Sequence, residues 1–123
     1  MPDIDGHHRG LMVAEAHEIA HATSRTFVLT CGTKKIDGFV VNFHGKFYAY
    51  VNRCCHIPMR MDWIENEFFT RDKRLLICPT HGASYDPTTG LCLDGPCPGE
   101  YLETIPVSVK GGQIVVYCPP EWD

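Results

Sequence analysis

Two short clusters of cysteine and histidine constrain this chain more than any other feature of its sequence. The first holds Cys54 and His56 in the spacing C-x-H, and the second holds Cys78 and His81 in the spacing C-x-x-H. Two thiolates and two imidazoles can bind a 2Fe–2S cluster in which one iron takes the two cysteines and the other takes the two histidines. Because imidazole is neutral and thiolate is anionic, such a cluster accepts an electron more easily than an all-cysteine cluster does. The pattern therefore points to electron transfer.

Length and composition indicate one ordinary globular domain. The chain has 123 residues, of which 44% are apolar and 21% are charged, and this is enough for one domain with its own core. The formal net charge is −4, which disfavours nucleic acid as a partner. No apolar stretch approaches the roughly 18 residues of a membrane-spanning helix, so no membrane association is expected.

The seven cysteines admit two interpretations. Small secreted proteins use many cysteines as a disulfide framework. However, the first ten residues have no apolar run of the kind that a secretory signal needs. We therefore expect a cytoplasmic protein in which clustered thiols bind metal.

Most of the chain is predicted to form β-strands, because runs of β-branched and aromatic residues alternate with turns that contain Gly or Pro. The predicted strands cover residues 25–30, 38–43, 46–51, 74–77, 83–86, 91–93, 102–109 and 113–117. Their spacing favours an all-β sandwich or barrel. The exception is the segment 11–22, where the apolar residues predict a short helix.

The segment around the second cluster resembles the Rieske family of iron–sulfur proteins. Residues 78–86, Cys-Pro-Thr-His-Gly-Ala-Ser-Tyr-Asp, are similar to the family stretch C-P-x-H-G-x-x-[FY]-D, and residues 95–98, Gly-Pro-Cys-Pro, resemble its proline loop. The resemblance implies an all-β sandwich over residues 13–118. It also implies a small cluster-binding part at about 52–98 and tails at 1–12 and 119–123. Cys54 and Cys78 would bind the buried iron, and His56 and His81 the outer iron.

Three departures from the family pattern bear on the cluster. The gap between His56 and Cys78 is 21 residues, longer than the commonest spacing of the family, which predicts an extra turn or a longer hairpin between the two loops. Met59 and Thr80 stand where the high-potential members carry a disulfide, and Ala83 replaces a serine whose hydroxyl bonds a cluster sulfide in those members. Fewer hydrogen bonds to sulfur predict a potential in the lower part of the roughly −150 to +300 mV Rieske range.

The resemblance implies a soluble ferredoxin that carries one electron and performs no catalysis by itself. Its expected partners are an NAD(P)H-dependent flavin reductase and a terminal oxygenase, and we expect a monomer. A small Rieske subunit of a nitrite-reductase-like complex is the alternative within the family.

Two alternatives involve zinc. His17, Glu18 and His21 form the pattern H-E-x-x-H, which on a helix binds zinc and supplies a general base for hydrolysis. The four ligands of the predicted cluster would also suit a structural zinc ion. Cys55 is expected as a solvent-side or packed thiol, and Cys31 and Cys118 are expected in the core or at its edge. Cys92 and Cys97 are expected as packed thiols, with a redox-active disulfide between them as the alternative.

Overall fold

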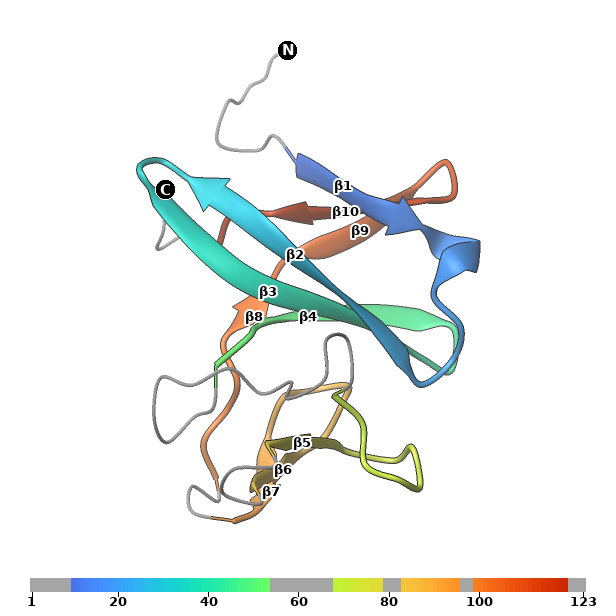
Figure 1. Ribbon diagram of the computed structural model, residues 1–123, viewed down its shortest axis with the longest axis vertical. Helices are drawn as coiled ribbons and strands as arrows, with labels where there is room; N and C mark the ends of the chain where they lie inside the picture. The colour runs from blue at the N-terminus through green and yellow to red at the C-terminus, as the bar shows by residue number, and fades with distance from the viewer. Residues whose placement is uncertain (1–9, 54–67, 79–82, 96–98, 120–123) are drawn as a thin grey trace.

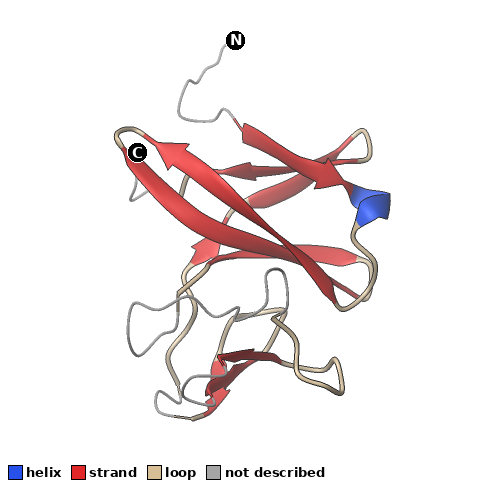
Figure 2. Cartoon of the chain, viewed as in Figure 1, coloured by secondary structure: helices blue, strands red, loops and turns tan. Residues whose placement is uncertain are grey.

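Figure 1 shows the computed structural model as three β-sheets stacked one above another, and Figure 2 shows how little helix accompanies them. The structure describes residues 10–53, 68–78, 83–95 and 99–119. Within these ranges every pair of neighbouring strands is antiparallel. The predicted all-β fold is therefore confirmed.

Each sheet combines strands from different parts of the chain. The upper sheet has the order β1-β10-β9, from β1 (Gly10–Glu15), β10 (Gln113–Tyr117) and β9 (Val107–Lys110). The middle sheet has the order β2-β3-β4-β8, from β2 (Thr23–Cys31), β3 (Lys34–Phe43), β4 (Lys46–Val51) and β8 (Thr104–Ile105). The lower sheet has the order β5-β6-β7, from β5 (Leu76–Cys78), β6 (Ala83–Tyr85) and β7 (Cys92–Asp94).

The middle sheet is buried on both faces, which explains its uninterrupted apolar runs. Successive side chains of a strand point to opposite faces. On β3, Phe39 and Val41 belong to the core shared with the lower sheet, whereas Val40 belongs to the core shared with the upper sheet. On β4, Tyr50 faces the lower core, and Ala49 and Val51 face the upper core. The sheet thus connects the two halves of the molecule.

The predicted hairpins around the turns at His44-Gly45 and Gly111-Gly112 are both present. Residues 34–43 pair with 46–51, and residues 107–110 pair with 113–117. A further hairpin occupies part of the long gap between the two cysteine–histidine clusters. There Phe69 bridges Leu76 across a turn that the Lys73 amide closes on the Thr70 carbonyl, over 2.9 Å.

The predicted helix over residues 11–22 is wrong. Residues 10–15 form β1, and only Ala16–Glu18 form a helix, the 3-10 helix η2. The reason is tertiary: β1 pairs with β10, about a hundred residues further along the chain, with Val13 as the extra residue of a bulge. This pairing, which places Ala14 in the core, overrides the local helical pattern.

The first described strand, β1, begins at Gly10, within the segment 1–12 that was expected to be an N-terminal tail. No described helix is long and apolar enough to cross a membrane.

Candidate functional site

The lower sheet carries the backbone of the second cysteine–histidine cluster. β5 ends at Cys78, as predicted, and Cys78 pairs with Ala83, the first residue of β6. The connection between them, including His81, lies outside the described residues. The pairing of β5 with β6 therefore holds Cys78 and Ala83, the two ends of this connection, opposite each other.

The first cluster follows the end of β4. The amide of Val51 donates to the carbonyl of Glu103 over 2.9 Å, and the amide of Asn52 donates to the carbonyl of Asp37 over 2.7 Å. These two bonds fix the chain immediately before Arg53, although Cys54, Cys55 and His56 themselves lie outside the described residues. The described structure thus positions the start of one loop and both ends of the other.

Buried side chains pack between the lower sheet and the middle sheet. Ala83, Ser84 and Tyr85 are all buried on β6, and Tyr85 is completely inaccessible. Phe68 stacks on Phe39 of β3, with the ring centroids 3.9 Å apart and the planes 9° from parallel. A sheet of three short strands gains rigidity from this packing, as a site of fixed geometry requires.

Gly95 belongs to a third loop, which approaches Ala83 at the end of the second cysteine–histidine loop. Its φ of +108° lies in a region that L side chains rarely adopt, and a Cβ there would lie 2.5 Å from the Cα of Ala83. Only glycine allows such a close approach of two backbones. Pro96, Cys97 and Pro98 of the expected proline loop lie outside the described residues.

Tyr50 connects the middle sheet to the turn that follows β6. Its hydroxyl donates to the carbonyl of Pro87 over 2.8 Å, and its ring lies against Gly90. Burial raises the pKa of the Tyr50 phenol well above its ordinary value, and the carboxylate of Asp86 raises it further. The phenol is therefore a neutral donor that holds the turn.

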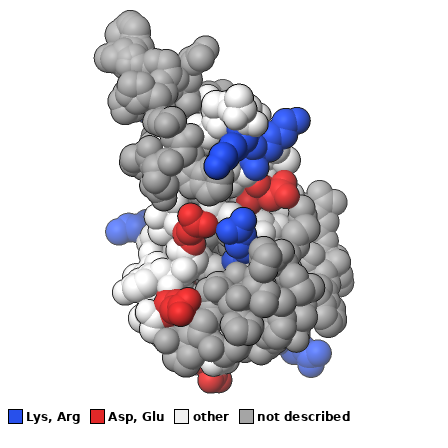
Figure 3. Space-filling model, turned by 90° about the vertical axis from the view of Figure 1, so that its left-hand side faces the viewer, with Lys and Arg blue, Asp and Glu red and all other residues white. Residues whose placement is uncertain are grey.

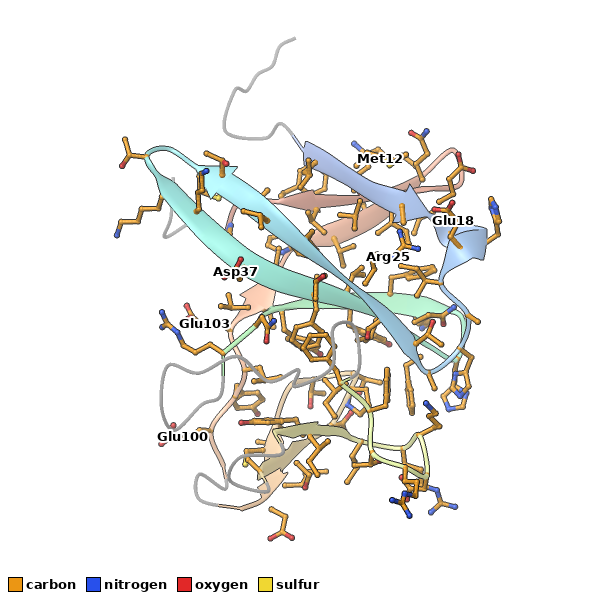
Figure 4. The ribbon with its side chains drawn as sticks, viewed as in Figure 1. Met12, Glu18, Arg25, Asp37, Glu100 and Glu103 are labelled. Carbon is orange, nitrogen blue, oxygen red and sulfur yellow. A yellow bond between two sulfur atoms is a disulfide. The ribbon has the colours of Figure 1, made fainter. Side chains whose placement is uncertain are left out.

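The face beside these elements carries several carboxylates. Asp37, Glu100 and Glu103 lie on the same side of the molecule in Figure 4, and Figure 3 shows carboxylates together with lysine and arginine side chains on that side. Arg53 lies 4.0 Å from Glu103, and both side chains are about half exposed. Such an exposed pair contributes little to stability, but it partly neutralises Glu103.

The zinc-hydrolase pattern does not form a zincin site. His17 lies in η2, with its Nδ1 3.7 Å from Glu15, whereas Ile19 already has extended dihedral angles. The Nδ1 of His21 accepts a hydrogen bond from the amide of His44 over 2.9 Å. The two histidines are therefore not on one helical face, and no group of three potential metal ligands occurs among the described residues.

Comparison with known proteins identifies the family. The model of the Rieske [2Fe-2S] domain matches residues 10–117. The chain belongs to the Rieske [2Fe-2S] domain family. No match is found among curated protein sequences.

Solved structures agree with this assignment of the Rieske fold. A chain from a complex of reduced oxygenase and oxidised ferredoxin in carbazole 1,9a-dioxygenase is 27% identical with a TM-score of 0.70, over 88% of this chain and 92% of that one. The ferredoxin of carbazole 1,9a-dioxygenase from Nocardioides aromaticivorans IC177 is 22% identical with a TM-score of 0.67, over 89% and 98%. A ferredoxin from Sphingomonas yanoikuyae B1 is 21% identical with a TM-score of 0.66, over 90% and 100%.

The donor set of the chain fits the 2Fe–2S cluster of the Rieske family. The cysteine and the histidine of each pair have the spacing of the family motif, and the strand β5 ends at Cys78 as expected. The cluster, when bound, supplies a centre that accepts and returns one electron. The polypeptide contributes loop ends fixed by backbone hydrogen bonds and a buried surface beside them.

The remaining described cysteines divide into two kinds. Cys31 and Cys118 form a disulfide with a Cα–Cα distance of 5.8 Å, a pairing that the sequence did not predict. The partners are 87 residues apart and meet only because β2 and the end of β10 lie close in the fold. Cys92 is buried, and its thiol donates to the carbonyl of Asp94 over 3.3 Å, as expected for a packed thiol. Cys97 lies outside the described residues.

Proposed function

We propose that this chain is a one-electron carrier of the ferredoxin type that feeds a terminal oxygenase. Cys54 and Cys78 would hold the inner iron of its Rieske cluster, and His56 and His81 the outer iron. The observation that carries the proposal is the family match over residues 10–117. The 27% identity to a chain of an oxygenase–ferredoxin complex supports an oxygenase as the partner.

The donor of electrons would be an NAD(P)H-dependent flavin reductase, and the carrier would work as a monomer in the cytoplasm. The 22% identical neighbour is the ferredoxin component of a dioxygenase system, which supports a place between a reductase and an oxygenase. The disulfide of Cys31 and Cys118 is unusual for a cytosolic protein, so its redox state in the cell tests the proposed location.

Stoichiometric reduction tests the proposal. The anaerobic protein is assayed for iron and sulfide and titrated with dithionite while its visible absorption is followed. The expected result is about two irons and one accepted electron for each chain. A chain that holds zinc and accepts no electron would overturn the proposal and favour the structural-zinc alternative.

The ligand assignment is tested separately with His81→Cys and Cys55→Ser. Thiolate in place of imidazole adds negative charge to the cluster, so His81→Cys should lower the potential or abolish cluster binding. Cys55→Ser should leave both unchanged, because Cys55 is not among the proposed ligands. An unchanged potential in His81→Cys would remove His81 from the ligand set.

A further inference from the structure

Two large apolar side chains are exposed beside the second cluster loop. Leu93 of β7 is 49% exposed, and Tyr101 is 60% exposed. The two residues lie on backbone segments that run side by side, because Leu91 forms a β-bridge with Tyr101. In addition, the amide of Cys92 donates to the carbonyl of Glu100, and the carbonyl of Cys92 accepts from the amide of Gly99. We refer to these two exposed apolar side chains on neighbouring segments as the Leu93–Tyr101 surface.

The local backbone explains why Leu93 faces solvent. Along β7, Cys92 pairs with Tyr85 and Asp94 pairs with Ser84, so Leu93 is the extra residue of a bulge. A bulge re-aims the side chain at its extra position. Of its two neighbours, Cys92 is buried in the lower core and Asp94 is exposed. The bulge therefore accounts for the exposure of Leu93.

Three carboxylates lie close in sequence to this apolar surface. Residues 91–103 include the carboxylates Asp94, Glu100 and Glu103, and they include no lysine or arginine. All three carboxylate side chains are exposed. Glu100 and Glu103 lie on the same side of the molecule (Figure 4), the side that faces the viewer in Figure 3. An apolar centre with a charged rim is the usual anatomy of a protein–protein interface.

The Leu93–Tyr101 surface is also connected to the proposed electron site. β7 pairs with β6, and β6 pairs with β5, which ends at Cys78. Gly95, two residues after Leu93, lies against the backbone of Ala83 in the second cluster loop. A protein bound at this surface would therefore lie within a few residues of the loop that is proposed to hold the cluster.

We propose that the Leu93–Tyr101 surface, with Asp94, Glu100 and Glu103, docks a redox protein that presents a basic rim around an apolar patch. This inference rests on the proposed electron-carrier function. Charge complementarity favours a basic partner, because the exposed carboxylates of Asp94 and Glu100 attract positive charge and repel an acidic surface. Glu103 adds less to this attraction, because Arg53 lies 4.0 Å from it. The exchange moves one electron from the reduced protein to the oxidised partner, and no covalent bond forms or breaks.

The test measures how fast the dithionite-reduced protein passes its electron to cytochrome c, a basic haem protein that serves as the probe. Asp94→Lys/Glu100→Lys reverses two rim charges, and Glu15→Lys/Glu18→Lys makes the same change of net charge on the opposite side of the chain. Both variants are checked for thermal stability and for the visible spectrum of the cluster. A small uncharged quinone is the second oxidant, because it needs no docking surface.

At low salt, the rim variant should react with cytochrome c about tenfold more slowly or worse, and the difference should shrink as salt rises. The Glu15/Glu18 variant should change the rate far less. For the apolar centre, Leu93→Ser should slow the reaction at all salt concentrations, whereas Val28→Ser, at a residue that is 52% exposed, should not.

Equal slowing by both charge variants would show that only net charge matters, and it would overturn the docking surface. Unchanged rates in the rim variant would do the same. If neither cytochrome c nor the quinone is reduced by the unmodified protein, the electron-carrier proposal itself fails. Normal reduction of the quinone with no dependence on the rim leaves that proposal intact and removes only the docking surface.

Discussion

The hydroxyl of Tyr50 donates a 2.8 Å hydrogen bond to the carbonyl of Pro87, and this bond joins the middle sheet to the lower one. Tyr50 lies near the end of β4, four residues before Cys54, and Pro87 follows the β6 segment that contains Tyr85. One side chain thus links the polypeptide before the first cluster loop to the polypeptide after the second. We expect this link to determine how firmly the two loops are held relative to each other.

Tyr50→Phe should lower the free energy of unfolding by about 1–3 kcal/mol, because it leaves the Pro87 carbonyl without its partner in a buried environment. Urea denaturation of the anaerobic protein, followed by the visible absorption of the cluster, measures this change. Tyr101→Phe is the control, since that side chain is 60% exposed. Equal stability of the two variants would contradict the role assigned to the bond.

Alkaline pH should weaken the fold through the same phenol. Burial raises the pKa of Tyr50 in the folded state above the ordinary value of 10.0, so the stabilising effect is complete below pH 10 and is lost as the pH rises further. Above pH 10 the unfolded chain releases a proton that the folded chain retains, which lowers the unfolding free energy by up to about 1.4 kcal/mol per pH unit. Denaturation curves between pH 9 and pH 11.5 should show a shallower fall in Tyr50→Phe; identical slopes would argue against a buried neutral phenol.

Gly95→Ala should loosen the third loop and promote loss of the cluster. The substitution places a Cβ 2.5 Å from the Cα of Ala83 and also imposes a φ of +108° on alanine. Gly99→Ala is the matched control, because Gly99 has a φ of +87° in the same segment but nothing within 4 Å of its Cβ position. Strain alone costs about 1–3 kcal/mol, and this should be the whole effect in Gly99→Ala. The half-life of the visible chromophore in air should be much shorter in Gly95→Ala, and similar half-lives would refute the close approach.

Removal of the Cys31–Cys118 disulfide should destabilise the fold and leave the cluster spectrum unchanged. The bridge closes a loop of 87 residues, for which the chain-entropy account gives roughly 4.5 kcal/mol. Cys31→Ser/Cys118→Ser, compared with the unmodified protein by thermal unfolding, measures the loss. The control is the unmodified protein in a disulfide reductant, which should behave as the double variant does. No difference among the three samples would mean that the bridge is not formed in solution.

Short-range chemistry made most of the fold predictable. The turns at His44-Gly45 and Gly111-Gly112 and the strand that leads into Cys78 are each specified by a few neighbouring residues. The segment that begins β1 was mispredicted because its partner, β10, is distant in sequence. The same cause hid the disulfide between Cys31 and Cys118.

The sequence predicts the ligands of the candidate site but not the packing that supports it. The ligand set stays a prediction, because Cys54, His56 and His81 lie outside the described residues. The stacking of Phe39 on Phe68 joins residues that are far apart in the sequence. The outward position of Leu93 depends on a bulge, and no pattern in the neighbouring sequence predicts that bulge. Contacts between residues that are distant in sequence depend on how the sheets pack, and a single sequence does not predict that packing.

The measurement that tests the central claim most directly is an electron paramagnetic resonance spectrum of the dithionite-reduced protein, with iron and zinc assayed on the same anaerobic sample. A rhombic signal of low average g value, with about two irons for each chain, is the result expected for a cluster bound by two cysteines and two histidines. A silent, colourless protein that holds zinc would contradict the account.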